Sequence, residues 1–332
     1  MNKLNDIAVI GGGSWGTALV KIFLENTEKL NWFIRDSELI ENIQLKKRNT
    51  KYLRHVQLDI KKITMFSKIE EIIDSSDLLV IATPSPFIHN TFKQYKDKLK
   101  GKYIISASKG VIPISQLVIS EHFIKEFEVP SENIGIISGP CHAEEVAQEK
   151  LSYLTVGTNT KNLGKFVSEK LSTNYIKTSF SDDLIGIEYS ATIKNVYSLL
   201  VGVCHGLGYG DNFLSVLISH CAKELRLFIT TIKKDKNRDL NHSAYFGDLL
   251  VTTYSTFSRN RTFGNMLGKG YSVKSAMSEM SMVVEGYYAA KNAYEIAKKL
   301  NIECTYINAT HSILYELANP KKTIKDLADK LY

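Results

Sequence analysis

Residues 7–20, IAVIGGGSWGTALV, set the architecture of the first half of the chain. An apolar run typical of a buried strand leads into a GxGxxG pattern formed by Gly11, Gly13 and Gly16, and a helical run follows. In this pattern the first glycine permits a tight turn, the second lets a pyrophosphate approach the backbone, and the third lets the helix pack on the strand. Backbone N–H groups at the helix start would face the phosphates. The stretch therefore predicts a dinucleotide-binding unit.

The second strand of such a unit should end about 20 residues further on, where Arg35 and Asp36 are neighbours. An acidic residue at this position usually binds the adenosine ribose hydroxyls, whereas an arginine can pair with a 2′-phosphate. The two residues together leave both NAD and NADP open as the cofactor.

Short β-rich runs alternate with longer helical patterns through the rest of the first half. Near-continuous apolar strands separated by helices predict a parallel sheet covered on both faces, which is a doubly wound Rossmann α/β fold. The expected strands are residues 7–11, 31–35, 77–83, 102–108 and 133–139, with residues 152–157 and 174–179 extending the sheet at its edge. The expected helices between them include residues 17–25, 86–99 and 115–126.

From about residue 182 the pattern becomes helical almost throughout, with apolar residues spaced for amphipathic helices. We therefore expect two domains, a dinucleotide-binding Rossmann domain over residues 1–181 and an all-helical substrate domain over residues 182–332. The charged run at residues 233–239 is interpreted as a solvated loop between two helices.

The composition is that of a folded globular protein. The chain has 332 residues, of which 44% are hydrophobic and 23% are charged, with only 6 prolines, so disordered and collagen-like classes are excluded. Its 42 Lys and Arg against 35 Asp and Glu give a net charge of +7, spread along the chain. This excess favours anionic small molecules, and we expect no nucleic-acid partner.

The cysteines and the apolar stretches indicate a cytoplasmic location. Four widely spaced cysteines without CxxC or CxxH patterns support neither a zinc site nor a disulfide framework, so we expect reduced thiols and no metal. The first residues show neither an apolar h-region nor a cleavage signature, so we expect no secretion. The most apolar long stretch, residues 184–203, contains Glu188, Lys194 and Asn195, so a buried helix is favoured over a membrane span.

Three loops follow strands of the predicted sheet, at the edge where open α/β sheets bind ligands. The first contains Pro84 and Ser85, and it could equally be an ordinary turn. The second contains Lys109, whose charge could meet a phosphate. In the third, Gly139 ends a strand and Ala143 begins a helix.

In the helical half, Lys194 lies among apolar and small residues. A lysine buried without a partner loses affinity for its proton and becomes suited to proton transfer. The alternative is a lysine that reaches the solvent from a helix surface.

The segment TFSRNRTFG, residues 256–264, places Ser258 as an N-cap with Arg259, Asn260 and Arg261 in the first helical turn. Cations there oppose the helix dipole unless an anion is also bound, which is an argument for a phosphate site. Exposed arginines on a helix turn are the alternative. Glu285, at the start of a later helix, needs no functional explanation.

The motifs in this order resemble those of bacterial-type NAD(P)-dependent glycerol-3-phosphate dehydrogenases. The resemblance runs nearly from end to end, through GGGSWGTAL, SASKG, SGPCHAEEVA, IKNV, GLGYGDN, GDLLVT, SRNRTFG and VVEG. It implies a Rossmann domain joined to a helical domain, and interconversion of dihydroxyacetone phosphate and sn-glycerol 3-phosphate, the backbone of phospholipids. A helical domain of this kind is compatible with a homodimer without requiring one.

The resemblance also implies roles for individual residues. Lys194 would be the proton donor and acceptor, with Asp248 orienting it. The cofactor would contact the glycine loop and Ser14, Trp15, Arg35, Lys109, Ala143, Arg259, Val283 and Glu285. The substrate would contact Lys109, Gly139, Cys141, Lys194, Asp248, Ser258, Arg259 and Asn260. Members of the family usually have GPSFA where this chain has residues 139–143 as GPCHA, so a thiol replaces a hydroxyl.

Two other functions use the same motifs. A related reductase acting on an unphosphorylated 2-keto acid would share the Rossmann domain and a lysine in the helical domain, but the cations Lys109 and Arg259 would be superfluous. A cofactor-sensing module without catalysis would have no need of Lys194 or Asp248. In the favoured scheme, Lys194 and Arg259 converge over a nucleotide held by the first domain.

Overall fold

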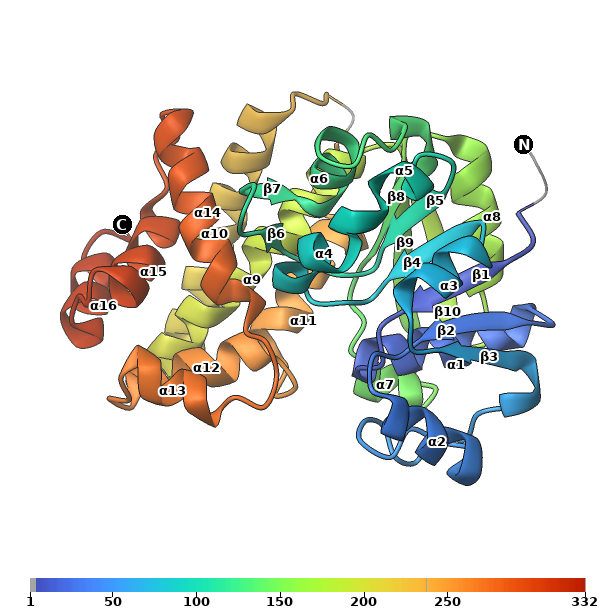
Figure 1. The fold of residues 1–332 in the computed structure, drawn as a ribbon. Helices are drawn as coiled ribbons and strands as arrows, with labels where there is room; N and C mark the ends of the chain where they lie inside the picture. Colours follow the sequence, from blue (N-terminus) through green and yellow to red (C-terminus); the bar gives the residue numbers. More distant parts are fainter. Residues whose placement is uncertain (1–3, 237, 332) are drawn as a thin grey trace. The chain divides into compact units, whose positions relative to one another are not determined.

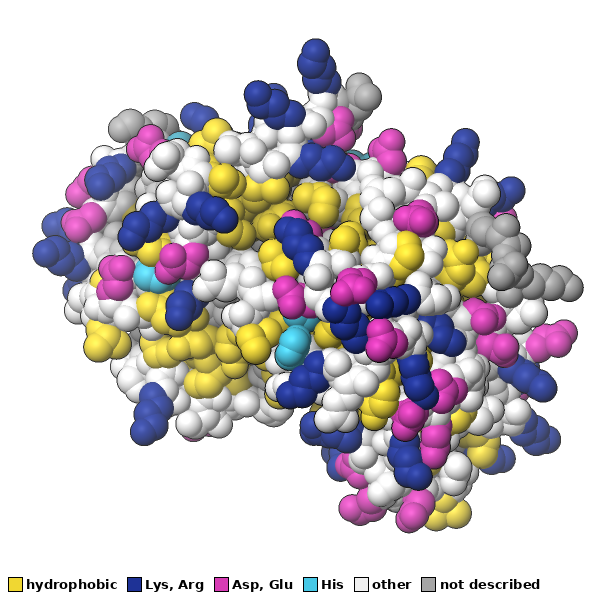
Figure 2. Space-filling view, turned by 45° about the horizontal axis from the view of Figure 1, so that its top comes forward, with side chains coloured by type: hydrophobic (Ala, Val, Ile, Leu, Met, Phe, Trp, Pro, Cys, Tyr) yellow, Lys and Arg dark blue, Asp and Glu magenta, His cyan; other side chains and the backbone are white. Residues whose placement is uncertain are grey.

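The computed structural model describes residues 4–236 and 238–331. The chain forms two compact units, one ending at Leu184 and the other beginning at Ile185 (Figure 1). No helix in the described ranges has both the length and the apolar character needed to cross a membrane. Lys and Arg side chains are interspersed with Asp and Glu over the face shown in Figure 2, in keeping with their spread along the sequence.

The first unit is built on one eight-stranded sheet with the order β10-β9-β8-β5-β4-β1-β2-β3. Strand β1 pairs in parallel with both β2 and β4, so the order reverses beside β1 and creates the switch point where such folds bind ligands. The strands are β1 (Ile7–Ile10), β2 (Leu30–Phe33), β3 (Ile63–Phe66), β4 (Leu78–Ile81), β5 (Tyr103–Ser106), β8 (Ile134–Ser138), β9 (Ser152–Thr158) and β10 (Ile176–Ser181).

Helices cover the sheet because its central strands are apolar on both faces. Every residue of β1, β4 and β8 is buried. In one layer, helix α1 (Ser14–Asn26) contacts both α7 (Ala143–Ala147) and α8 (Lys161–Leu171). The connections after β3 run in the opposite direction across the sheet, which places the other layer on the opposite face. That layer contains α3 (Ile69–Asp74), α4 (Ser85–Phe92), α5 (Lys96–Leu99) and α6 (Ile119–Lys125), while α2 (Ser37–Lys46) follows β2 (Figure 1).

The fold class is confirmed, with corrections to its details. The sheet is mixed rather than all parallel, because β9 runs antiparallel to β8 after α7 turns the chain back, and β10 then runs parallel to β9. The helix expected over residues 115–126 begins only at Ile119, since Gln116 has a φ of 56° and β7 (Leu117–Val118) forms a hairpin with β6 (Val111–Ile112). The helix expected over residues 86–99 is divided by a 3₁₀ turn.

The second unit is helical, as expected. A loop was expected at residues 233–239, and its described residues are indeed outside helices, whereas residue 237 lies outside the described ranges. A short π-helical turn, Ser243–Gly247, then precedes the next helix. The helices are α9 (Leu184–Gly206), α10 (Asp211–Ile232), α11 (Asp248–Tyr254), α12 (Arg259–Gly268), α13 (Val273–Glu279), α14 (Glu285–Lys299), α15 (Thr305–Tyr315) and α16 (Pro320–Ala328).

Helix α9 is the core of this unit, since every residue from 186 to 204 is buried. Helix α12 packs against α9 so closely that their backbones are in contact, which is possible because both helices have glycines at the crossing. A Cβ at Gly202 would lie 2.2 Å from the carbonyl oxygen of Arg261, and one at Gly264 would lie 2.0 Å from that of Leu199. Gly206 and Gly268, one turn further along each helix, make similarly close approaches. Only glycine fits at these four positions without moving a backbone.

Candidate active site

The glycine loop after β1 has the geometry that the sequence predicts. Gly11 has a φ of +136°, and a Cβ at Gly16 would lie 2.1 Å from the carbonyl oxygen of Gly11, so backbone conformation and packing require both glycines. Gly13 has a φ of −77°, and a Cβ there would meet nothing within 4 Å. The open space in front of Gly13 is what a bound pyrophosphate needs. The loop therefore fits a dinucleotide, with the first-turn N–H groups of Ser14 and Trp15 at the start of α1.

Asn49 supports this loop and was missed by the sequence argument. Its buried side-chain amide donates to the carbonyl oxygen of Gly12 at 3.0 Å and to Thr17 Oγ1 at 2.8 Å. Trp32 in β2 donates from Nε1 to the carbonyl oxygen of Gly11 at 2.9 Å. The loop is thus held from a strand and from a turn beyond α2. Neither contact has a local sequence signal, because each joins residues well separated along the chain.

The two residues after β2 have different environments. Asp36 is the N-cap of α2, accepting from the Leu39 N–H at 3.2 Å, and it forms an ion pair with Lys51. The hydrogen bond from Lys51, together with the one from Leu39, lowers the pKa of Asp36. Arg35 is exposed at the end of β2. Helix α2 and Lys51 therefore engage the Asp36 carboxylate, whereas the arginine faces solvent.

The loops after β5 and β8 meet at the carboxyl edge of the sheet. Lys109 donates from Nζ to the carbonyl oxygen of Gly139 at 3.2 Å, which joins two residues assigned to the site. Gly139 has a φ of +129°, and a Cβ there would lie 2.5 Å from the carbonyl oxygen of Tyr153. Cys141 is half-buried and Ala143 is the first residue of α7. All three loops follow strands, as expected, but Ser85 is the first residue of α4 and so lies one residue outside the helix expected over residues 86–99.

In the second unit, Lys194 is buried and paired. The residue is 4% exposed, its amine donates to Asp248 Oδ1, and it also donates to Thr252 Oγ1 at 2.7 Å. Asp248 is the first residue of α11, where the helix dipole favours a carboxylate. The amine is thus buried with partners, rather than without one. The lysine is therefore not at a helix surface, and Asp248 and Thr252 fix the direction of its amine.

Helix α12 is fixed close to this pair by its N-cap. Ser258 accepts from the Arg261 N–H at 3.4 Å, and its hydroxyl lies 2.8 Å from that of Ser198 on α9. Ser198 follows Lys194 by one helical turn. Thr252 and Ser198 were not singled out from the sequence. Their spacing of four residues from Asp248 and Lys194 places them on the same helix faces, but the sequence does not indicate their partners.

The first turn of α12 contacts the start of α14. Arg259 is exposed and donates from one guanidinium nitrogen to the carbonyl oxygen of Val283 at 3.1 Å. Buried Asn260 accepts from the Gly286 N–H at 2.9 Å. Glu285 is the first residue of α14. The structure thus brings together the sequence-predicted residues of the second unit: Lys194 with Asp248, and Arg259 and Asn260 with residues 283–286.

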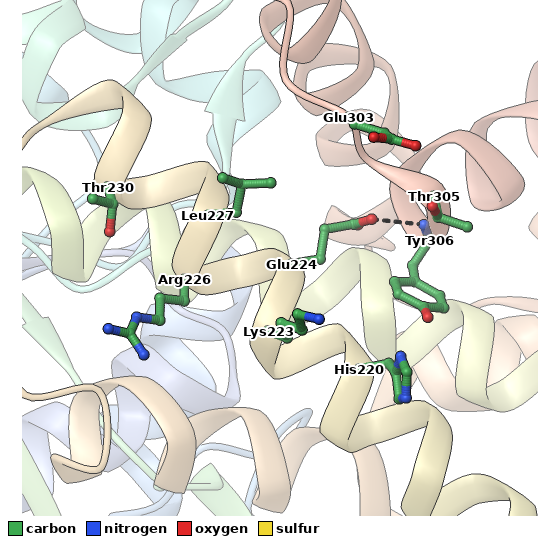
Figure 3. Close-up of a pocket in the computed structure, with 9 residues that line it drawn as sticks. All are labelled: His220, Lys223, Glu224, Arg226, Leu227, Thr230, Glu303, Thr305 and Tyr306. Carbon is green, nitrogen blue, oxygen red and sulfur yellow. Dashed lines mark hydrogen bonds between the residues drawn. The ribbon is translucent and has the colours of Figure 1, made fainter. Parts of the chain in front are cut away.

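The second unit also has an open pocket of about 540 Å³ away from these residues (Figure 3). It lies between α10 and the start of α15, and none of its lining residues was selected from the sequence. At its base Glu224 accepts from the backbone N–H groups of Tyr306 at 2.9 Å and Ile307 at 3.0 Å. Tyr197 also donates to this carboxylate, at 3.2 Å. Glu224 therefore caps α15 from a neighbouring helix.

The buried cap predicts a pH-dependent stability. Burial raises the pKa of Glu224 to about 7, although the backbone hydrogen bonds from Tyr306 and Ile307 oppose the shift. The ordinary pKa of this carboxyl group is 4.5. At pH values between 4.5 and about 7, Glu224 therefore holds a proton in the folded chain that it has released in the unfolded chain. This stabilisation is complete below pH 4.5 and is lost as the pH rises through 7. Relative to Glu224→Gln, the wild type should lose up to about 3 kcal/mol across this window.

Urea unfolding of both proteins between pH 4.5 and 8 measures this difference. Glu303→Gln, at an exposed carboxylate of the same pocket, is the matched control and should follow the wild type. A Glu224→Gln curve parallel to the wild-type curve would show that the cap does not titrate in this range.

The fold and these residues define a class, the nicotinamide-dependent oxidoreductases in which a Rossmann unit precedes a helical unit. Family models described as the N-terminus and the C-terminus of NAD-dependent glycerol-3-phosphate dehydrogenase match residues 6–164 and 183–325. The chain therefore belongs to the NAD-dependent glycerol-3-phosphate dehydrogenase family, and the resemblance seen in its sequence is confirmed.

Individual relatives match nearly the whole chain. Glycerol-3-phosphate dehydrogenase [NAD(P)+] from Staphylococcus aureus (strain bovine RF122 / ET3-1) is 33% identical over 330 residues, covering 98% of each chain. The protein of the same name from Clostridium botulinum (strain Eklund 17B / Type B) is 32% identical, covering 98% of this chain and 97% of the relative. The crystal structure of glycerol-3-phosphate dehydrogenase from Coxiella burnetii has a TM-score of 0.90 at 26% identity, covering 98% of this chain and 99% of the other.

Proposed function

We propose that this chain catalyses the reversible reduction of dihydroxyacetone phosphate to sn-glycerol 3-phosphate with NADH or NADPH, and so supplies the backbone of phospholipids. The observation that carries this proposal is the buried Lys194, held by Asp248 and Thr252 in a chain of this family. A buried ion pair contributes little to stability by itself, because desolvation offsets the attraction. A proton-transfer role explains why an ionisable amine lies in the core of a helical unit.

Lys194 is the proposed proton donor to the substrate carbonyl oxygen, and in the reverse direction it takes the proton back. The amine is suited to this role because Asp248 and Thr252 restrict its direction. Proton transfer from a positioned side chain contributes about 10²- to 10⁴-fold to a rate. The bound dinucleotide supplies or accepts the hydride.

The substrate phosphate is proposed to bind at the first turn of α12. Ser258 caps this helix, so the backbone N–H groups and the Arg259 guanidinium both favour an anion there. Arginine presents five donors, of which the bond to Val283 uses one. Asn260, Lys109, Gly139 and Cys141 are the further proposed substrate contacts. Two cations in this set fit a phosphorylated substrate better than a simple 2-keto acid.

The dinucleotide is proposed to bind at the glycine loop of the first unit. Gly13 leaves the space for its pyrophosphate, and Gly11 and Gly16 set the turn. The other proposed contacts are Ser14, Trp15, Arg35, Lys109, Ala143, Arg259, Val283 and Glu285.

An assay of NAD(P)H oxidation tests the proposed function. Absorbance at the nicotinamide band should fall with dihydroxyacetone phosphate and much more slowly with dihydroxyacetone, because the latter lacks the anion. Equal rates with both compounds, or faster turnover of a 2-keto acid, would support the related reductase instead. Nucleotide binding without turnover of any of them would indicate a binding module.

The environment of Arg35 and Asp36 favours NADPH. Because Asp36 is engaged by α2 and Lys51, Arg35 is the residue available to pair with a 2′-phosphate. Arg35→Ala is expected to raise the KM for NADPH at least about tenfold, since hydrogen bonds to charged groups contribute about 1.5–3 kcal/mol. The KM for NADH should change little. Steady-state kinetics with both cofactors measure the two effects.

Asp36→Asn is the matched variant, because asparagine preserves the N-cap of α2. It should leave both KM values within about twofold of wild type. A large rise in the KM for NADH in this variant would show that Asp36 binds the ribose, contrary to the preference proposed.

A further inference from the structure

A buried hydroxyl on α9 links the catalytic helix to the turn between α11 and α12. Ser198 is fully buried and donates from Oγ to the backbone carbonyl oxygen of Thr252 at 2.8 Å. That carbonyl belongs to the last turn of α11, where helical carbonyls lack an intrahelical partner. The same Oγ lies 2.8 Å from the hydroxyl of Ser258, the N-cap of α12. Ser198 therefore contacts the end of one helix and the beginning of the next.

The direction of these hydrogen bonds follows from the number of protons available. A serine hydroxyl has one proton, and Ser198 uses it toward Thr252, so Ser258 is the donor between the two hydroxyls. Ser258 in turn accepts from the Arg261 N–H. A continuous chain runs from the first turn of α12 through both serines to α11. Such chains are strengthened by mutual polarisation in a buried environment.

We propose that Ser198 is a positioning residue that clamps the α11–α12 turn and so fixes the first turn of α12, with Arg259, relative to Lys194. The proposal rests on the proposed function, since it assigns the substrate phosphate to that turn. Lys194 is held by the side chains of Asp248 and Thr252, whereas Ser198 binds the backbone carbonyl of Thr252. Loss of the Ser198 hydroxyl should therefore affect the phosphate more than the proton transfer.

The variant Ser198→Ala tests this division. It leaves the Thr252 carbonyl without its donor and the Ser258 hydroxyl without its acceptor, two hydrogen bonds in all. We expect the KM for dihydroxyacetone phosphate to rise about ten- to hundredfold, which is the range for two such bonds. The KM for NADPH and the slow turnover of dihydroxyacetone, which has no phosphate to hold, should both change much less than the KM for dihydroxyacetone phosphate.

Ser190→Ala is the matched control. Ser190 lies four residues before Lys194, and Ser198 lies four residues after it. Both serines are fully buried. Its hydroxyl forms no hydrogen bond within the described part of the chain. This variant should retain wild-type kinetics with every substrate. If Ser190→Ala lowered kcat/KM as much as Ser198→Ala, the effect would come from any substitution in α9. The assignment of Ser198 as a positioning residue would then be overturned.

A double-mutant cycle tests whether the effect passes through Ser258. If the hydroxyl pair is the cause, Ser198→Ala combined with Ser258→Ala should lose less in kcat/KM than the product of the two single losses. The proposal would be overturned if Ser198→Ala lost kcat/KM equally with both substrates, or lost none. It would also be overturned if the two single losses in kcat/KM simply multiplied in the double variant. A wild-type protein that does not turn over dihydroxyacetone phosphate would instead refute the proposed function.

Discussion

Lys194→Met is expected to lower kcat with dihydroxyacetone phosphate by about 10²- to 10⁴-fold, the range for loss of a general acid. Methionine has a similar length but no ionisable proton to donate. Cofactor binding should remain nearly intact, because the glycine loop belongs to the other unit. Single-turnover kinetics and quenching of NADPH fluorescence measure the two effects separately.

The single variant also removes the ammonium partner of the buried Asp248 carboxylate, and breaking a buried ion pair in this way can cost about 3–5 kcal/mol of folding free energy. A second protein, Lys194→Met with Asp248→Asn, removes both charges and should recover most of the lost stability. It should remain as inactive as the single variant. If the double variant regains activity to within tenfold of wild type, Lys194 contributes to the stability of the fold and is not the proton donor.

Arg259→Ala is expected to lower kcat/KM for dihydroxyacetone phosphate by about 10²- to 10⁴-fold. The estimate assumes two charge-assisted hydrogen bonds of about 1.5–3 kcal/mol each between the guanidinium and the phosphate. Turnover of dihydroxyacetone should fall far less, because that compound makes neither bond and is affected only through the proposed contact of Arg259 with the dinucleotide. Arg259→Lys keeps the charge but loses the planar fork, so its kcat/KM should lie between those of alanine and wild type.

Arg226→Ala provides the control, since Arg226 is an exposed arginine of the same unit at the pocket beside α10. It should have no effect on either substrate. If Arg259→Ala reduced turnover of dihydroxyacetone as strongly as that of the phosphate, the arginine would support the site in general. The assignment of the phosphate to α12 would then be wrong.

The parts of the structure that could be predicted are those whose sequence patterns lie within a few neighbouring residues. The strand, the glycine loop and the start of α1 lie within fourteen consecutive residues, and the glycines have steric reasons that hold in any context. The burial of Lys194 could also be anticipated, because apolar residues precede and follow it through the whole of α9. Its pairing with Asp248 came from resemblance to a family and not from spacing.

The parts that were missed depend on contacts between distant residues. Strand β3 has the sequence ITMF, is only four residues long and is not fully buried, so its sequence signal is short. The antiparallel direction of β9 depends on how α7 turns the chain. Asn49 and Ser198 are ordinary polar residues in sequence, and each becomes significant only through partners 32 to 60 residues away.

The glycine crossing between α9 and α12 has a consequence for the thermodynamics of substrate binding. Because backbone atoms are in contact at Gly202 and Gly264, neither helix can slide without a clash. The first turn of α12 is therefore ordered before any substrate arrives, and anion binding costs little conformational entropy. Binding of the phosphate should accordingly be accompanied by a small entropy change in the protein, with amide hydrogens of α9 and α12 exchanging slowly both with and without substrate.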